Sequence, residues 1–257
     1  QRVTELSDKL AAEGASLQVL DIIFPTSSSG DPKLVERLKK NNAVLAQTFA
    51  LDANVHVSIG QPAGSLSWAA CPANLPVAQG FVANEAAFGS LPVGHITPHI
   101  EEDGNLRRQP ALICYQDKVY PALFIVALSK ALSVGVSPIE AGTGLLAPAW
   151  RLPSPSFEKS GLPLDSQGLV RVPWALHPDA FISLSAADVL AGRTPQHLLR
   201  HAWVVVGSSA LGLNDRIATP FSVNSAGLMV HAQLLRGVLD GVIPTQPRLA
   251  PAYTTLI

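Results

Sequence analysis

The chain has 257 residues, of which 47% are hydrophobic and 14% charged, with a formal net charge of −1. This apolar, charge-poor composition excludes intrinsic disorder, and the absence of a heptad or Gly-X-Y period excludes a coiled coil and collagen. With 18 Lys plus Arg against 19 Asp plus Glu, the chain lacks a basic field for nucleic acid, so we expect no nucleic-acid partner. No linker divides the sequence, and we treat residues 1–257 as one domain.

The first third of the chain carries the strongest structural signal. An apolar run of strand length at residues 17–24 is followed by Asp31 and Pro32. These two predict a helix with Asp31 as its N-cap and Pro32 at the first helical position. A second apolar run at residues 43–51 predicts another strand. Strand, helix and strand in this order predict a right-handed parallel crossover.

The middle of the chain is less regular. Residues 54–76 are rich in Gly, Pro, Ala and Ser, which predicts a long loop or a small insertion. Residues 95–101 alternate between apolar and polar side chains, as a half-buried strand does. Asp103 and Gly104 then predict a turn, with residues 106–115 returning as the second strand of a hairpin.

The polar face of this predicted strand raises the question of a metal. It consists of His95, Thr97, His99 and Glu101. On a strand, His95 and His99 stand about 13 Å apart, too far to share one zinc ion. We therefore expect a solvated strand face, no metal and no cofactor.

The last half alternates between helices and strands. An apolar segment after Pro121 predicts a buried helix, and short strands are expected near Leu145 and Leu169. Ser185 begins a capped helix, residues 203–206 form an apolar strand of the kind found inside a parallel sheet, and a helix follows at 227–240. The expected fold is α/β: a mixed, partly parallel sheet flanked by helices, with long Pro/Gly-rich loops.

The turn after the 203–206 strand invites two enzyme interpretations. A nucleophile elbow requires G-x-S-x-G, and the residues from Gly207 to Leu211 lack the second glycine. A dinucleotide fingerprint requires G-x-G-x-x-G, which Gly207 and Gly212 do not provide. We therefore expect an ordinary tight turn and no catalytic residue.

The polar loop beyond this turn is a candidate site, because ligands of open α/β sheets bind outside the carboxyl ends of strands. Asp215 either belongs to such a site or holds the loop through hydrogen bonds, and both alternatives stay open. Of Arg107 and Arg108, we expect one to pair with a carboxylate and the other to be solvated, and either can recognise an anion. For His231 we prefer a neutral, partly buried histidine to a catalytic base. The candidates for ligand binding or signal coupling are Asp103, Arg107, Arg108, Asp215, Arg216, Thr219 and His231.

Cys71 and Cys114 leave two alternatives open, one disulfide in an oxidising compartment or two buried thiols. We expect free thiols, since Cys71 falls in an irregular loop and Cys114 in a strand.

Several segments together resemble the type-two CHASE sensory domain, over roughly residues 17–241. Glu101 and Ala226 depart from it, because aspartate and proline are common there. The segments that carry the resemblance are Asp21 to Phe24, Asp31 to Leu34, Val44 to Ala46, Gly80, Asp103 to Arg108, Tyr120 to Leu123, Val189 to Gly192, Val204 to Gly207, Gly212 to Asp215, Thr219-Pro220 and Gly227 to Ala232.

This resemblance implies a periplasmic sensory domain of a bacterial inner-membrane receptor, held by membrane helices that lie outside residues 1–257. The stimulus is then an unknown small molecule or physical signal. A cytoplasmic kinase, cyclase or cyclic-dinucleotide module would provide the output. A homodimer is among the alternatives for the oligomeric state. The rival hypotheses are a hydrolase-like α/β enzyme and a free solute- or peptide-binding module.

Overall fold

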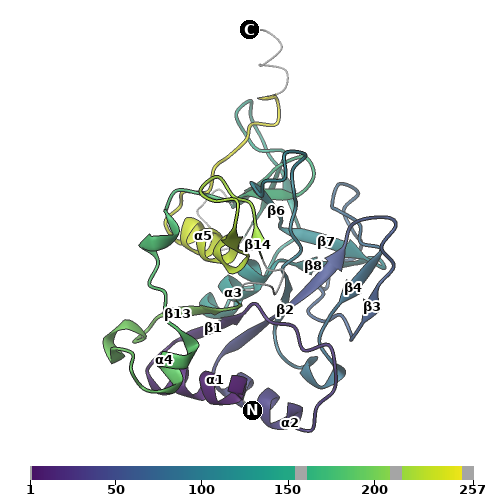
Figure 1. The fold of residues 1–257 in the computed structure, drawn as a ribbon. Helices are drawn as coiled ribbons and strands as arrows, with labels where there is room; N and C mark the ends of the chain where they lie inside the picture. The colour runs from purple at the N-terminus through teal and green to yellow at the C-terminus, as the bar shows by residue number, and fades with distance from the viewer. Residues whose placement is uncertain (1, 154–160, 209–215, 251–257) are drawn as a thin grey trace.

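The computed structural model describes residues 2–153, 161–208 and 216–250. The fold is mixed α/β, as the sequence predicts, with a partly parallel main sheet between two helical layers (Figure 1). Within the sheet β13, β1, β2 and β5 are parallel, and β4 is antiparallel to β2. The described strands of this sheet follow the order β13 (Trp203–Val206), β1 (Leu17–Leu20), β2 (Ala43–Ala50), β4 (Gly80–Val82) and β3 (Ser58–Ile59), with β5 (Val93–His95) paired to β2.

Successive side chains of β1 face opposite helical layers. Leu17 and Val19 join the core that contains α3 (Leu123–Leu132) and α5 (Leu228–Leu239). Leu20 packs with the other layer, formed by α1 (Arg2–Ala12) and α2 (Asp31–Lys40), as Figure 1 shows below the sheet. Because both faces are covered, β1 appears in the sequence as a nearly continuous apolar run.

The predicted parallel crossover is confirmed by β1, α2 and β2, with Val19 opposite Val44. Its boundaries differ slightly. The first strand ends at Leu20, and Gly30 rather than Asp31 is the N-cap of α2. Asp31 begins the helix, and its Oδ2 accepts a hydrogen bond of 2.8 Å from the Ser28 amide.

The predicted hairpin of residues 95–101 and 106–115 is wrong in its extent. β5 ends at His95, and one isolated bridge joins His99 to Arg108. Residues 106–115 divide because Pro110 has no amide hydrogen and the Ala111 amide donates to the Gly168 carbonyl. The two resulting strands, β6 (Arg108–Pro110) and β7 (Leu112–Tyr115), pair respectively with β12 (Leu169–Arg171) and β8 (Lys118–Pro121).

Most elements of the last half match the prediction. Helices α3 and α5 and strand β12 are confirmed, and the Ser185 Oγ accepts from the Ala187 amide at the start of α4 (Ala186–Leu190). No strand forms at Leu145. Strand β13 ends the described strand order, so it is an edge rather than an interior strand. Within the described residues, no helix has the length and apolar character to cross a membrane.

The remaining elements are short. Three-residue helical turns connect longer elements, and two further small sheets lie outside the main one in addition to the β12–β6 and β7–β8 pairs. These elements are η1 (Ala86–Phe88), η2 (Pro178–Ala180), η3 (Gln196–Leu198), a sheet of β11 (Leu162–Leu164), β10 (Trp150–Leu152) and β9 (Glu140–Ala141), and a ribbon of β14 (Arg216–Ile217) and β15 (Ser225–Ala226).

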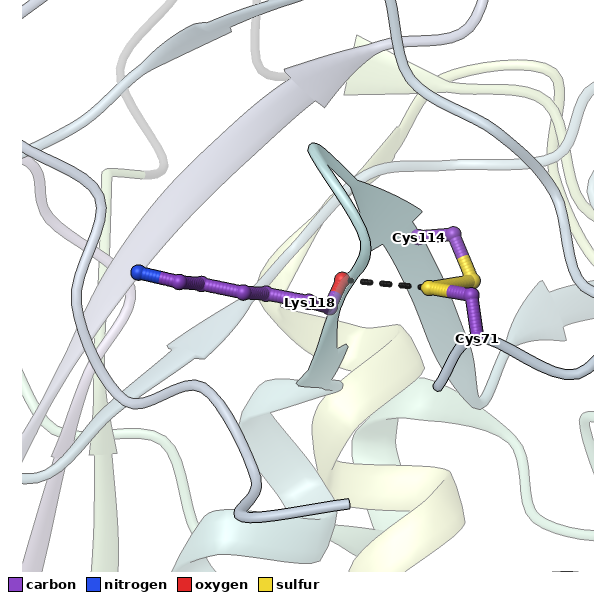
Figure 2. The surroundings of a disulfide bond; sticks show 3 residues. All are labelled: Cys71, Cys114 and Lys118. Atoms are coloured by element: carbon purple, nitrogen blue, oxygen red, sulfur yellow. Dashed lines mark hydrogen bonds between the residues drawn. A yellow bond between two sulfur atoms is a disulfide. The ribbon is translucent and has the colours of Figure 1, made fainter. Parts of the chain in front are cut away.

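The prediction of free thiols is wrong, because Cys71 and Cys114 form a disulfide (Figure 2). Their Cα atoms are 5.9 Å apart, and the Cys71 Sγ lies 3.4 Å from the Lys118 carbonyl oxygen. The loop containing Cys71 is irregular yet docked, since the Leu66 amide donates to the Val119 carbonyl of β8. The packing that brings this irregular segment and the strand together is therefore not visible in the local sequence pattern.

Candidate functional site

The parallel strands β1 and β13 end side by side beneath the start of α5. The Asp21 amide donates to the Val206 carbonyl at 2.8 Å. A Cβ placed on Gly207 would lie 3.1 Å from Leu228 Cδ2 and 3.4 Å from Asp21 Cβ, so backbone and helix are in close contact here. From β1 the chain proceeds to β2 on one side and later returns as β13 on the other. This reversal is the position where open α/β sheets bind ligands.

The polar loop predicted after β13 is described only in its second half. Asp215 lies outside the described residues, and the backbone of Arg216 forms part of β14. Thr219 is buried: its Oγ1 accepts from the Ser222 amide at 3.2 Å and lies 3.0 Å from the Ser225 Oγ. Thr219 therefore fixes the turn between β14 and β15, directly before α5.

Asp103 and Arg107 form an exposed bidentate ion pair. Arg107 Nη1 and Nη2 donate to the two Asp103 carboxylate oxygens at 2.9 Å and 2.6 Å. The hydrogen bond from Arg107 holds the pKa of Asp103 below its usual range, with a further contribution from the Asn105 amide. The pair closes the turn that the sequence predicted at Asp103 and Gly104.

Arg108 is held more deeply than its neighbour. Its Nε and Nη2 donate to the two Glu101 oxygens at 2.7 Å and 2.8 Å, and its Nη1 donates to Asp165 Oδ2 at 2.8 Å. The hydrogen bonds from Arg108 lower the pKa of Glu101, and those carboxylates raise the pKa of Arg108. The expectation that only one of the two arginines pairs with a carboxylate is wrong, because both do, although Arg107 is also exposed to solvent.

A backbone contact joins the Asp103–Arg108 segment to the Thr219 turn. Asn105 and Ala218 form a parallel bridge, and the Leu106 amide donates to the Ala218 carbonyl at 2.8 Å. The Leu106 carbonyl in turn accepts a hydrogen bond of 2.9 Å from Trp174 Nε1. Candidates that lie more than a hundred positions apart in the sequence are thus brought to one region, next to the start of α5.

His231 lies within the first turns of α5 and is 2% exposed, more deeply buried than expected. Burial lowers its pKa to about 4. His95, at the end of β5, is fully buried, and burial together with the charge of His231 lowers its pKa to about 3. Among the described residues, no hydrogen-bond partner is found for either ring nitrogen of His95 or for Nδ1 of His231.

The predicted solvated face of residues 95–101 is therefore wrong. Besides His95, Thr97 is buried, where its Oγ1 accepts from the Phe49 amide at 2.8 Å. His99 Nε2 lies 3.4 Å from Arg108 Nη2, the arginine that also binds Glu101. The alternation of polar and apolar side chains predicted a solvated face, but these polar side chains contact other parts of the fold instead of water.

Sequence reasoning also missed Asp165 as a partner of Arg108, since nothing local links residues 57 positions apart. Across the described ranges, no group of three or more His, Cys, Asp or Glu side chains has the arrangement to hold a metal ion. His99 and Glu101, the closest pair of potential ligands on the predicted strand, both contact Arg108 instead.

Comparison with known proteins gives one positive result. No curated protein and no solved structure matched the chain. The model of the CHASE2 domain matches residues 1–256, essentially the whole length, and this is a family of extracellular sensory domains. The match covers the sheet, the disulfide and the α5 region alike, and the chain belongs to the CHASE2 domain family.

Proposed function

We propose that this chain is the periplasmic sensing domain of a bacterial inner-membrane receptor and relays a conformational signal to a cytoplasmic output module. The observation that carries the proposal is the family match over residues 1–256, because CHASE2 is a sensory family rather than a catalytic one. Membrane helices outside the given sequence would anchor the domain. A small molecule or a physical stimulus would act on it, and a second copy of the chain is a candidate partner.

The disulfide supports an extracytoplasmic location. Disulfides such as Cys71–Cys114 persist in oxidising spaces, including the bacterial periplasm, and are rare in the reducing cytoplasm. Cys114 is 3% exposed, so the bond is integrated into the packing between the loop and the β7–β8 hairpin.

The contacts around Thr219 support a route for the signal. The Asp103–Arg108 segment bridges to Ala218, Thr219 fixes the following turn, and β15 leads into α5. A stimulus that binds or rearranges this region can shift the position of α5 only by its differential affinity for two states. As coupling or binding residues, we propose the seven sequence candidates: Asp103, Arg107, Arg108, Asp215, Arg216, Thr219 and His231.

Two buried threonines allow a controlled test of this route. Thr219 is 4% exposed and belongs to the proposed route, whereas Thr194 is 9% exposed and bonds to Glu13 Oε2 at 3.0 Å in the α1–α4 region. In the full-length receptor in membranes, Thr219→Val should change the basal output without any stimulus. Thr194→Val should leave the output unchanged at a comparable loss of thermal stability.

The outcome that contradicts the route is an equal effect of both variants on output, or no effect of either. Accessibility of an engineered surface cysteine to a membrane-impermeant reagent in whole cells tests the location separately. Labelling only after the inner membrane is broken would contradict the periplasmic assignment.

A further inference from the structure

Two buried histidines lie in the core, one at the end of a strand of the main sheet and one on α5. His95 is the last residue of β5 and His231 is the fourth residue of α5, and both are almost completely buried. Both rings belong to the interior of the fold, and after burial the charge of His231 is the second cause of the lowered pKa of His95. They come from separate elements, which allows their environment to change when α5 moves relative to the sheet.

The hydrogen bonding of the two rings is incomplete. Within the described ranges, His95 Nδ1, His95 Nε2 and His231 Nδ1 lack hydrogen-bond partners. A neutral imidazole carries one N–H donor, and a buried donor without a partner destabilises the folded state. A protonated imidazole has two donors and a full charge, so protonation in place would be more unfavourable still.

Among the described residues around the two rings, no group compensates the positive charge of a protonated imidazole. From β2, Gln47 pairs with His95 in the strand register, and the Phe49 ring lies edge-on at 6.2 Å between centroids. The elements packed against α5 are α3, whose one titratable residue is the exposed Lys130, and β13, which has none. Besides α3 and β2, β5 packs against β8, which carries the exposed Lys118 and the buried Tyr120. Burial is the first cause of the lowered pKa of both histidines, and the charge of His231 lowers that of His95 further.

The position of each residue in the fold opposes protonation further. His95 bridges to Ala122, the N-cap of α3, and His231 lies near the start of α5. A helix N-terminus carries a partial positive charge, which repels an imidazolium. The start of α5 has no side-chain cap hydrogen bond at Gly227.

The second half of α5 is fixed by two contacts of its own. Gln233 Nε2 donates to the Leu176 carbonyl at 2.6 Å, and Gly237 lies directly against Pro173. The first turns, with His231, are therefore the part of the helix that can open without loss of these contacts.

We propose that acidification opens the first turns of α5, because protonation of His95 and His231 is compatible only with their release from the core. Protons would then be a regulator of the Thr219–α5 region, and as a signal this inference rests on the proposed sensing function. A released histidine regains its ordinary pKa near 6.5, so each one favours opening about tenfold more at pH 5.5 than at pH 7.5. Two histidines together favour it about a hundredfold.

Amide hydrogen exchange of the 257-residue chain tests the proposal. After correction for intrinsic rates, the protection of α5 amides should fall about a hundredfold between pH 7.5 and pH 5.5. At pH 5.5 it should be lower than the protection of β1 and β2. His95→Gln and His231→Gln should each reduce the change to about tenfold, and the double variant should abolish it. His56→Gln, at an exposed histidine, should leave it at the wild-type value.

Two results would overturn the inference. One is a wild-type pH response in the double variant. The other is equal protection of α5, β1 and β2 at pH 5.5, which would mean that the histidines are released only by global unfolding. Either leaves the sensing function standing, because that function is tested by the output of Thr219→Val rather than by pH. A failure of the output test would in turn leave the measured opening of α5 intact.

Discussion

Arg107 and Arg108 are adjacent in sequence and both form bidentate ion pairs, yet their environments differ. The Arg107 side chain is 43% exposed and its partner Asp103 is 50% exposed. Arg108 is 22% exposed, and its partners Glu101 and Asp165 are 21% and 11% exposed. Ion pairs in water contribute little to stability because solvent screens them and ordering the side chains costs entropy. Arg108 is therefore the structural arginine of the two.

Replacing each arginine by lysine separates these roles. Lysine keeps the charge but cannot reproduce a planar fork of donors that binds two carboxylates. Arg108→Lys should lower the free energy of unfolding by about 1 kcal/mol, at the low end for charged hydrogen bonds because the side chain keeps some exposure. Arg107→Lys should leave the urea midpoint unchanged. An equal loss for both variants would contradict this assignment.

Helix α5 depends on one glycine for its closest packing. A Cβ added at Gly237 would lie 2.3 Å from Pro173 Cγ and 2.8 Å from Ile243 Cδ1. Contacts this short force the neighbours to move, and the ring of Pro173 has little freedom to do so. The absence of a side chain at Gly237 therefore lets the helix lie directly against the 172–177 segment.

Gly237→Ala should thus destabilise the protein although alanine is the better helix former by about 1 kcal/mol. We expect a net loss of about 1–3 kcal/mol, typical of overpacked sites. Gly135→Ala is the matched control, because a Cβ there meets nothing within 4 Å. Thermal or urea unfolding of both variants measures the difference, and a Gly237→Ala protein as stable as the wild type would refute the packing argument.

At the level of elements, the sequence predicts what local patterns determine. The crossover at 17–50 and the helices α3 and α5 follow from apolar period and length. The predicted hairpin at 95–115 is wrong in its extent. His95 and Thr97 are polar yet buried, so the alternation predicted the wrong environment for these side chains. Pro110 then divides the returning strand between two partners that lie elsewhere in the chain.

For the molecule as a whole, pH acts on stability through two separate sets of groups. His95 and His231 have folded pKa values of about 3 and about 4, below the ordinary value of 6.5. The unfolded chain then binds more protons below pH 6.5, so stability is complete above that pH and is lost as the pH falls. Glu101 and Asp103, whose pKa values are also lowered, contribute stability that is lost only at pH values below their ordinary 4.5 and 3.8.

Between pH 7.5 and pH 5.5, the free energy of unfolding should therefore fall by about 2–3 kcal/mol, of which each histidine accounts for half. Urea titrations at several pH values measure it. The double variant His95→Gln/His231→Gln should be nearly flat over this range and retain only the decline below about pH 4.5. A double variant that declines as the wild type does would show that other groups control the response.

The contacts of the site between distant segments could not be predicted from the sequence either. Leu106 meets Ala218, and Arg108 meets Asp165, through folding of segments that carry no mutual signal. The sequence identifies Thr219 and His231 as noteworthy residues through their place beyond a core strand. It does not reveal that His95, about 136 positions earlier, shares the interior with His231.

The disulfide closes a covalent ring that contains β4, β5 and β6, since Cys71 precedes these strands and Cys114 follows them. A protease that cuts one exposed peptide bond inside the ring cannot separate the two products. On a non-reducing gel the nicked protein would migrate near the intact chain, and only a reductant would resolve it into two fragments. A cut before Cys71 or after Cys114 would release a fragment under both conditions, so paired gels locate the nick relative to the ring.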